Sequence, residues 1–175
     1  MEENKKQSCC FFGHRKIAET AELTERLTQV VEELIIKKDV TDFYFGSKSD
    51  FNTLCLKIVT DLKGKYPHIR RVYVRSAYPD ISENYEDYLL ESYEETYYPE
   101  KIRGAGKASY VERNREMINK SNFCVVYYDE NYAPSGRKGK RSLTDSKPKS
   151  GTKIAYDYAA KKKCEIINLF MVRES

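Results

Sequence analysis

Short apolar segments alternate with longer amphipathic segments along most of the chain, and this alternation limits the possible folds more than any other feature of the sequence. Short apolar runs are typical of buried β-strands, and apolar residues three or four positions apart are typical of helices. The expected strands are residues 9–12, 42–45, 71–75, 122–128 and 165–170. The expected helices are residues 21–36, a helix that Asp50 caps and that residues 63–67 end, residues 109–120 and residues 152–162.

Strands that alternate with helices favour a sheet whose two faces are both covered. Right-handed crossovers then predict an α/β fold with a Rossmann-like, doubly wound and mainly parallel sheet. The 175 residues fit a single domain over residues 1–175. Two segments interrupt the alternation, a Tyr- and Glu-rich insertion at about 76–108 and a basic loop at about 129–151.

The formal net charge is only +4, but it is distributed unevenly. Residues 80–100 hold eight acids and no base, whereas residues 137–149 hold six bases and one acid. This pattern indicates local roles for two segments, or two solvated loops, rather than a general surface for nucleic acid. No run approaches the roughly 18 apolar residues of a membrane span, and the N-terminus lacks the apolar core of a signal peptide. We therefore expect a cytoplasmic protein without a membrane partner.

The five cysteines fit that compartment. Most of them lie inside apolar runs, no two form a CxxC pair, and no histidine stands at the spacing of a metal site. Free cysteine in such surroundings behaves as a small buried hydrophobic residue. We therefore expect buried thiols, and we expect neither a metal site nor a cofactor.

Polar turns follow three of the expected strands, two of them directly and the third after the basic loop. The residues of these three turns are Gly13, His14 and Arg15, then Gly46 and Ser47, then Ser150, Gly151 and Thr152. Because the carboxyl ends of parallel strands meet at one edge of a sheet, we expect all three turns on the same rim. Glycine lets backbone approach a ligand, and the N–H groups of a helix start attract anions. The alternative for each turn is geometry alone, with Ser150 as an ordinary helix cap.

Arg113 and the two histidines leave alternatives open. Arg113 shares a helical face with Met117, which predicts partial burial and a carboxylate or a phosphate as its partner. His14 is a candidate ligand contact or a residue that packs within its turn, and His68 is expected at the surface. The sequence contains no GxGxxG, GxxxxGK[ST] or GxSxG motif, so the signatures of dinucleotide, P-loop and α/β-hydrolase sites are absent.

Together these segments resemble the SLOG superfamily, which includes the Lonely Guy nucleotide phosphoribohydrolases and the DNA-processing protein A fold. The resemblance rests on FFGHR, FGS, ERNREMINKSNFCVVYY and SGTKIAYDYA followed by IINLF, and it covers most of the chain outside the insertion. It implies a ligand-binding role for Gly13, His14, Arg15, Gly46, Ser47, Arg113, Ser150, Gly151 and Thr152. Within this set, residues 150–152 resemble the end of the PGGxGT phosphate loop of the hydrolases.

One departure from these hydrolases concerns their catalytic acid. The enzymes carry a glutamate three residues after the threonine, and Ala155 occupies that position here. A phosphate site without this carboxylate lacks the group that would stabilise an oxocarbenium-like transition state or activate water. The resemblance therefore implies non-catalytic binding of a nucleotide-derived ligand, such as an NAD-derived or cyclic nucleotide signal. The protein would act as a sensor, or as a phage sponge that sequesters an antiphage immune signal. Tyrosines of the insertion could stack on the base of the ligand or close over it.

Two other functions stay open at the level of sequence. A nucleotide N-glycosidic hydrolase could use a relocated acid, for which Glu83, Glu86 and Glu112 are candidates. A nucleic-acid binder would use the basic loop, although the acidic segment would repel a phosphate backbone.

A homo-oligomer is also expected, because tyrosine is favoured in the cores of protein interfaces. The tyrosines of the insertion that could form such an interface are Tyr78, Tyr85, Tyr88, Tyr93, Tyr97 and Tyr98. The alternative is that these side chains cover the edge of the chain's own sheet. The sequence does not distinguish the two arrangements.

Overall fold

The computed structural model describes residues 6–132 and 150–171, and a sheet of six parallel strands forms its centre. The strands are β1 (Gln7–Gly13), β2 (Val40–Phe45), β3 (Arg70–Val74), β4 (Glu95–Tyr97), β5 (Phe123–Tyr127) and β6 (Glu165–Asn168). Their order in the sheet is β4-β3-β2-β1-β5-β6, and every neighbouring pair is parallel. From β1 the chain adds β2, β3 and β4 on one side of the sheet, and it then adds β5 and β6 on the other side of β1. The point at which the strand order changes direction therefore lies between β1 and β5.

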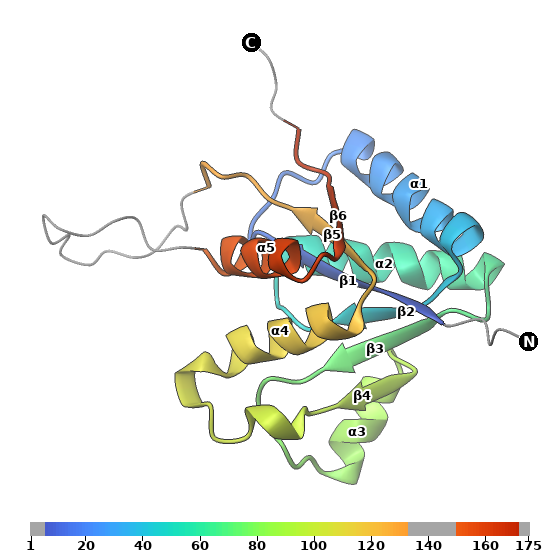
Figure 1. The fold of residues 1–175 in the computed structure, drawn as a ribbon. Helices are drawn as coiled ribbons and strands as arrows, with labels where there is room; N and C mark the ends of the chain where they lie inside the picture. Colours follow the sequence, from blue (N-terminus) through green and yellow to red (C-terminus); the bar gives the residue numbers. More distant parts are fainter. Residues whose placement is uncertain (1–5, 133–149, 172–175) are drawn as a thin grey trace, which may run out of the picture.

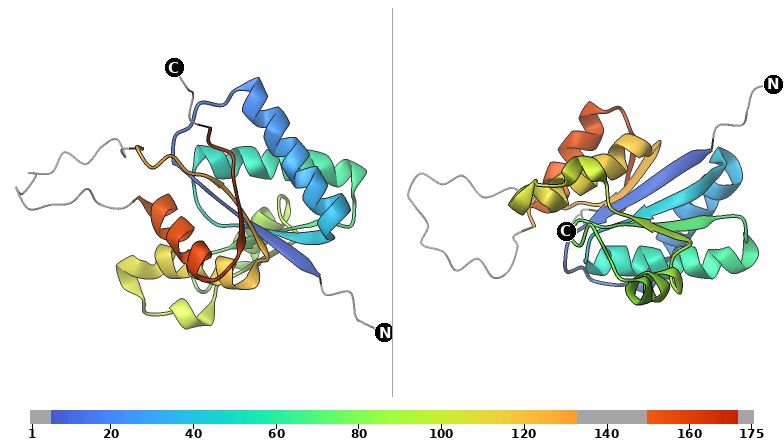
Figure 2. Two further views of the ribbon diagram at one scale, coloured as in Figure 1. Left: turned by 45° about the horizontal axis from the view of Figure 1, so that its top comes forward. Right: turned by 90° about the horizontal axis from the view of Figure 1, so that it is seen from below.

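Helices cover both faces of this sheet (Figure 1). One face carries α1 (Ala21–Lys38), α2 (Asp50–Lys65) and α3 (Glu83–Leu90), and the other carries α4 (Ser109–Lys120) and α5 (Gly151–Lys161). The right-hand view of Figure 2 shows these two helical layers on either side of the strands. The expected Rossmann-like α/β fold is confirmed. None of the described helices is both long and apolar enough to cross a membrane.

The middle strands are buried on both faces, which explains why their sequences are continuously apolar rather than alternating. Along β1, Cys9 and Phe11 pack against α1 and α2, whereas Cys10 and Phe12 face α4 and α5. All five cysteines are free thiols; four are buried and Cys164 is half-buried. Burial raises the pKa of the Cys9 thiol, as expected for a cysteine that acts as core rather than as a nucleophile.

The start of α2 differs from the sequence prediction by one residue. Ser49, and not Asp50, is the helix cap, because its Oγ accepts a hydrogen bond from the N–H of Asn52 at 3.1 Å. Asp50 is the first residue of the helix, where a carboxylate interacts favourably with the helix dipole. Serine and aspartate are both good caps, so two adjacent candidates cannot be separated by residue type alone.

The Tyr- and Glu-rich insertion extends the sheet. Its strand β4 pairs in parallel with β3 and forms one edge of the sheet. Between these strands lies α3, which Ser82 caps by accepting a hydrogen bond from the N–H of Tyr85 at 3.2 Å. Leu89 is the one buried residue among the eight of α3. This helix is therefore attached to the body by few apolar contacts.

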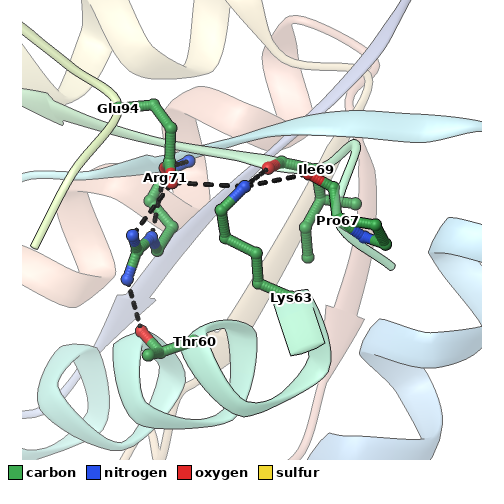
Figure 3. Close-up of polar contacts among 6 residues, drawn as sticks. All are labelled: Thr60, Lys63, Pro67, Ile69, Arg71 and Glu94. Carbon is green, nitrogen blue, oxygen red and sulfur yellow. Dashed lines mark hydrogen bonds and ion pairs between the residues drawn. The ribbon is translucent and has the colours of Figure 1, made fainter. Parts of the chain in front are cut away.

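A cluster of ion pairs links the insertion to β3 and α2 (Figure 3). Glu94 precedes β4, and its carboxylate accepts hydrogen bonds from Arg71 Nε at 3.1 Å and Nη2 at 2.9 Å. Lys63 Nζ lies 3.3 Å from the same carboxylate and donates to the carbonyl of Ile69 at 2.7 Å. Burial alone would raise the pKa of Glu94, but the hydrogen bonds from Arg71 and Lys63 outweigh it and lower this pKa to about 2.

Candidate ligand-binding pocket

The three polar turns lie at the same end of the sheet, as predicted. Gly13 ends β1, Gly46 directly follows β2, and Ser150 immediately precedes α5. In Figure 1 the strand arrows point toward the end of the molecule at which α5 begins. Both glycines are required by packing, because a Cβ at Gly13 would overlap the ring of Phe51 and a Cβ at Gly46 would lie 2.8 Å from Arg113 Cδ.

A pocket of about 550 Å³ opens at this end, on the face of the sheet that α2 and α3 cover. The turns after β1 and β2, the first turns of α2, strand β3 and the insertion all contribute to its lining. The volume is in the usual range of small-ligand sites. Of the predicted site residues, the structure brings Arg15, Gly46 and Ser47 to this pocket.

One side of the pocket is cationic. Arg15 and Lys16 reach it from the turn after β1, and Lys48 reaches it from the turn between β2 and α2. The N–H of Asp50 donates to the carbonyl of Arg15 at 2.8 Å, which holds the two turns together. The dipole of α2 adds positive potential at the same place. This side of the pocket therefore attracts an anionic group.

The other side of the pocket is aromatic. The ring of Tyr73, on β3, stacks with that of Tyr93 at a centroid distance of 5.1 Å, and Tyr85 stacks with Tyr88 on α3 at 6.2 Å. Burial raises the pKa of the Tyr73 phenol and raises that of Tyr93 to about 12, so both are neutral at pH 7. Neutral aromatic rings offer a surface on which another flat ring can stack.

His14 lies outside this pocket and is packed within the chain. Its side chain is 2% exposed, and its ring stacks on Tyr132 at a centroid distance of 3.9 Å. The backbone N–H of Asp129 donates to His14 Nε2 at 2.8 Å. Burial lowers the pKa of His14, so the imidazole is neutral at pH 7. His14 is therefore packed against the segment that follows β5, and a ligand contact for it stays a prediction.

Arg113 lies behind the Gly46 turn and does not line the pocket. It is 4% exposed, and its Nη1 donates to the carbonyls of Gly46 at 2.6 Å and Val74 at 3.5 Å. In the described ranges no carboxylate pairs with Arg113, and burial lowers its pKa to about 10. The sequence predicted a carboxylate or a phosphate as its partner. The guanidinium also donates from Nε to Asn114 Oδ1 at 2.9 Å, and of its two carbonyl partners Gly46 lines the pocket. A phosphate partner for Arg113 stays a prediction.

The Ser150 turn lies on the opposite face of the sheet, at the start of α5. Ser150 Oγ accepts a hydrogen bond from the N–H of Lys153 at 3.1 Å, so Ser150 caps the helix. Gly151 is exposed and Thr152 is buried, and neither lines the pocket. Ala155, at the position of the hydrolases' glutamate, is buried in the core between α5 and the sheet. A phosphate-binding role for this turn stays a prediction.

Acidic side chains contribute little to the pocket. Asp50 lines it, and its Oδ2 accepts a hydrogen bond from the N–H of Ile17 at 3.4 Å. The three acids suggested for a hydrolase, Glu83, Glu86 and Glu112, do not line it. Within residues 6–132 and 150–171, no group of three or more His, Cys, Asp or Glu side chains could hold a metal ion.

Some tyrosines of the insertion cover this chain's own sheet, whereas others are exposed, and an interface between subunits stays a prediction. Tyr93 and Tyr97 pack against this chain's own core clusters. By contrast, Tyr78 is 68% exposed and Tyr88 is 65% exposed. The insertion therefore covers part of its own sheet and also presents aromatic side chains to the outside.

Sequence reasoning missed most of the lining of this pocket. Lys16 and Lys48 lie next to predicted turn residues, so adjacency to Arg15 and Ser47 was a usable signal. Tyr73 carried no such signal, since nothing local indicates that the insertion folds over the α2 face of β3. Tyrosines of the insertion were expected near the base of a ligand, but the sequence did not indicate which of them line the pocket.

Comparisons with known proteins do not identify this chain. No protein-family model matches the sequence, and no curated protein is significantly similar to it. A functional assignment therefore depends on the chemistry of the pocket.

Proposed function

We propose that this protein binds a nucleotide-derived ligand and releases it unchanged. The observation that carries the proposal is the division of one pocket into a cationic side, with Arg15, Lys16 and Lys48, and a tyrosine side. A nucleotide has the same two parts, a phosphate that binds cations and a flat base that stacks on aromatic rings. A volume of about 550 Å³ suits a ligand of this size.

Glu83, Glu86 and Glu112, the acids suggested for a hydrolase, do not line the pocket, which supports binding without turnover. Ala155 is 2% exposed and packs in the core, so the position that carries the acid in the resembling hydrolases is closed to solvent here. The resemblance to SLOG proteins favours an NAD-derived or cyclic nucleotide signal as the ligand. A sensor or a sequestering sponge for an antiphage signal would both need tight binding and slow or absent turnover.

A thermal-shift screen with chromatography tests this proposal. The panel would contain AMP, NAD, ADP-ribose, cyclic ADP-ribose isomers and cyclic di- and trinucleotides, and each mixture would be separated afterwards. A true ligand at a hundred times its Kd stabilises the folded state by about 2.7 kcal/mol. A raised Tm with the ligand recovered intact would support the proposal. No shift with any member of the panel would count against it.

Single substitutions locate the binding to this pocket. Lys48→Ala and Arg15→Ala should each weaken nucleotide binding by roughly tenfold or more, because each removes a charge-assisted hydrogen bond donor. Lys57→Ala is the matched control, since Lys57 is an exposed lysine of α2 that does not line the pocket. Equal affinities in all three variants, measured by calorimetry, would show that the ligand binds elsewhere.

A nucleotide N-glycosidic hydrolase is the second candidate, and one observation favours it. Asp50 provides the pocket with a carboxylate at the cationic side, close to where a ribose phosphate would lie. If the chromatography shows free base or ribose phosphate, Asp50→Asn should abolish its formation while binding persists. Turnover that survives this substitution would exclude Asp50 as the acid.

A further inference from the structure

Tyr78 has an unusual backbone conformation for a bulky residue. Three non-glycine residues in the described ranges have a positive φ, namely Asp39, Tyr78 and Lys163. Asp39 and Lys163 follow the C-terminal ends of α1 and α5, where a left-handed residue is common. Tyr78 has a φ of 59° in the loop between β3 and α3, away from any helix end. A bulky side chain there costs free energy and persists only when its surroundings enforce it.

A buried arginine enforces this conformation. Arg75 is 8% exposed, and its Nε donates to the carbonyl of Tyr78 at 3.3 Å. Its Nη1 donates to Thr96 Oγ1 of the neighbouring strand β4 at 3.0 Å. Among the described residues no carboxylate forms an ion pair with Arg75, although buried charges are usually paired. The buried charge of Arg75 is therefore used to tie the Tyr78 loop to the sheet.

The ring of Tyr78, in the loop that Arg75 holds, lies next to two further aromatic rings, those of Tyr85 and Tyr88. The Tyr78 ring meets that of Tyr85 edge-on at a centroid distance of 6.5 Å, and Tyr85 stacks with Tyr88 at 6.2 Å. The exposed fractions of Tyr78, Tyr85 and Tyr88 are 68%, 38% and 65%. Tyr85 and Tyr88 line the pocket. We refer to Tyr78, Tyr85 and Tyr88 as the tyrosine row.

Charge decides which part of a nucleotide would lie against this row. The helix that carries Tyr85 and Tyr88 also carries Glu83, Glu86 and Asp87, and it has no basic residue. Carboxylates repel phosphate, so the phosphate would lie at the cationic side of the pocket, and the uncharged base would be the part that contacts α3.

We propose that the tyrosine row is the surface on which the pocket recognises the base of its nucleotide ligand, and that Arg75 is a positioning residue for it. The inference rests on the proposed function and specifies it further. Arg75 holds the strained Tyr78 loop, Tyr78 supports Tyr85, and Tyr85 and Tyr88 present their rings to the base. Stacking on aromatic rings tolerates different bases, so the row contributes affinity for any flat base.

A tryptophan substitution reports on this contact directly. The chain has no tryptophan, so Tyr88→Trp introduces a single fluorophore into the tyrosine row and keeps an aromatic ring there. The probes are AMP, GMP, CMP and UMP, with ribose 5-phosphate as the matched ligand that has a phosphate and no base. We expect saturable quenching by at least one nucleotide, and we expect ribose 5-phosphate to bind without quenching.

Affinity ratios give the decisive comparison. In the unsubstituted protein, the best nucleotide should bind roughly tenfold or more tightly than ribose 5-phosphate, and the double variant Tyr85→Leu with Tyr88→Leu should bring this ratio close to one. Arg75→Lys should lower the same ratio while the affinity for ribose 5-phosphate is unchanged, which general destabilisation would not produce. Tyr110→Leu, at a tyrosine of α4 that is 50% exposed and outside the pocket, should leave the ratio unchanged.

Several outcomes would overturn the inference while leaving the proposed function in place. One is a ratio near one in the unsubstituted protein, and another is a ratio that the leucine substitutions do not change. A third is a dimer in sedimentation that Tyr88→Leu converts to a monomer with the ratio intact, because the row would then contact a second copy. Absence of binding by every nucleotide and by ribose 5-phosphate would instead contradict the proposed function itself.

Discussion

Gly46 lines the pocket and its backbone packs directly against buried side chains of α4. A Cβ at this position would lie 2.8 Å from both Arg113 Cδ and Met117 Sδ. Gly46→Ala should therefore lower the free energy of unfolding by about 1 to 3 kcal/mol, because buried side chains must shift to admit the methyl group. Urea unfolding followed by circular dichroism measures this change.

Gly151→Ala is the matched control for that substitution. A Cβ at Gly151 meets no atom within 4 Å, and the residue is the first of α5. Alanine is a better helix former than glycine by up to about 1 kcal/mol, so the variant should be as stable as the parent or slightly more stable. Equal losses of stability in both variants would contradict the packing explanation for Gly46.

Tyr78→Gly separates backbone strain from ligand contact. Glycine adopts a φ of 59° without strain, so the variant should be as stable as the parent or more stable by up to about 1 kcal/mol. It should also reduce the preference for nucleotides over ribose 5-phosphate. Lys163→Gly relieves the same backbone conformation far from the pocket, and it should leave that preference unchanged. A marked loss of stability in Tyr78→Gly, measured by urea unfolding, would contradict the assignment of strain.

At the scale of elements, the attachment of the insertion depends on the Glu94 cluster. The pKa of Glu94 is lowered from 4.5 to about 2, so the folded state binds this proton less readily than the unfolded state. The resulting stabilisation is present above about pH 4.5 and is lost as the pH falls toward 2. Glu94→Gln should therefore be less stable than the parent at pH 6, and the difference should shrink by pH 3 in urea titrations.

Glu100→Gln is the control for this pH dependence. The hydrogen bond from Arg103 also lowers the pKa of Glu100, but this pair is exposed to solvent. Exposed ion pairs contribute little to stability, so the variant should follow the parent curve at every pH. If Glu94→Gln and Glu100→Gln showed the same change in stability with pH, the cause would be a general charge effect and not the ion-pair cluster of Glu94.

At the scale of the whole molecule, stability is distributed unevenly between the body and the insertion. Seven residues of α2 are buried, but Leu89 is the one buried residue of α3. Elements with few buried contacts open at low free-energy cost. Hydrogen exchange should therefore be fastest in α3 and slowest in β1 and β5, and a bound nucleotide should slow exchange in α3. Exchange in α3 as slow as in β1 would contradict this order.

The periodicity of apolar residues was sufficient to predict the main α/β fold, because each element carries its own pattern. Continuous apolar runs such as residues 9–12 and 123–126 predict strands that are buried on both faces, and the structure confirms them. The glycines at the ends of β1 and β2 were also identifiable, because a tight turn has a local signature. Element ends were less accurate, as the adjacent caps Ser49 and Asp50 illustrate.

The sequence by itself therefore determined the order of the elements outside the insertion, the parallel sheet and the edge of the sheet at which polar turns lie, since these follow from local patterns. It did not determine α3 and β4 within the insertion. Only the tertiary structure decided which turns share a pocket. It separated Arg15 and Gly46, on the α2 face, from the Ser150 turn at the start of α5. It also brought Tyr85 beside residues some 40 to 70 positions away. Contacts between distant segments depend on which faces pack together, and no local spacing encodes that choice.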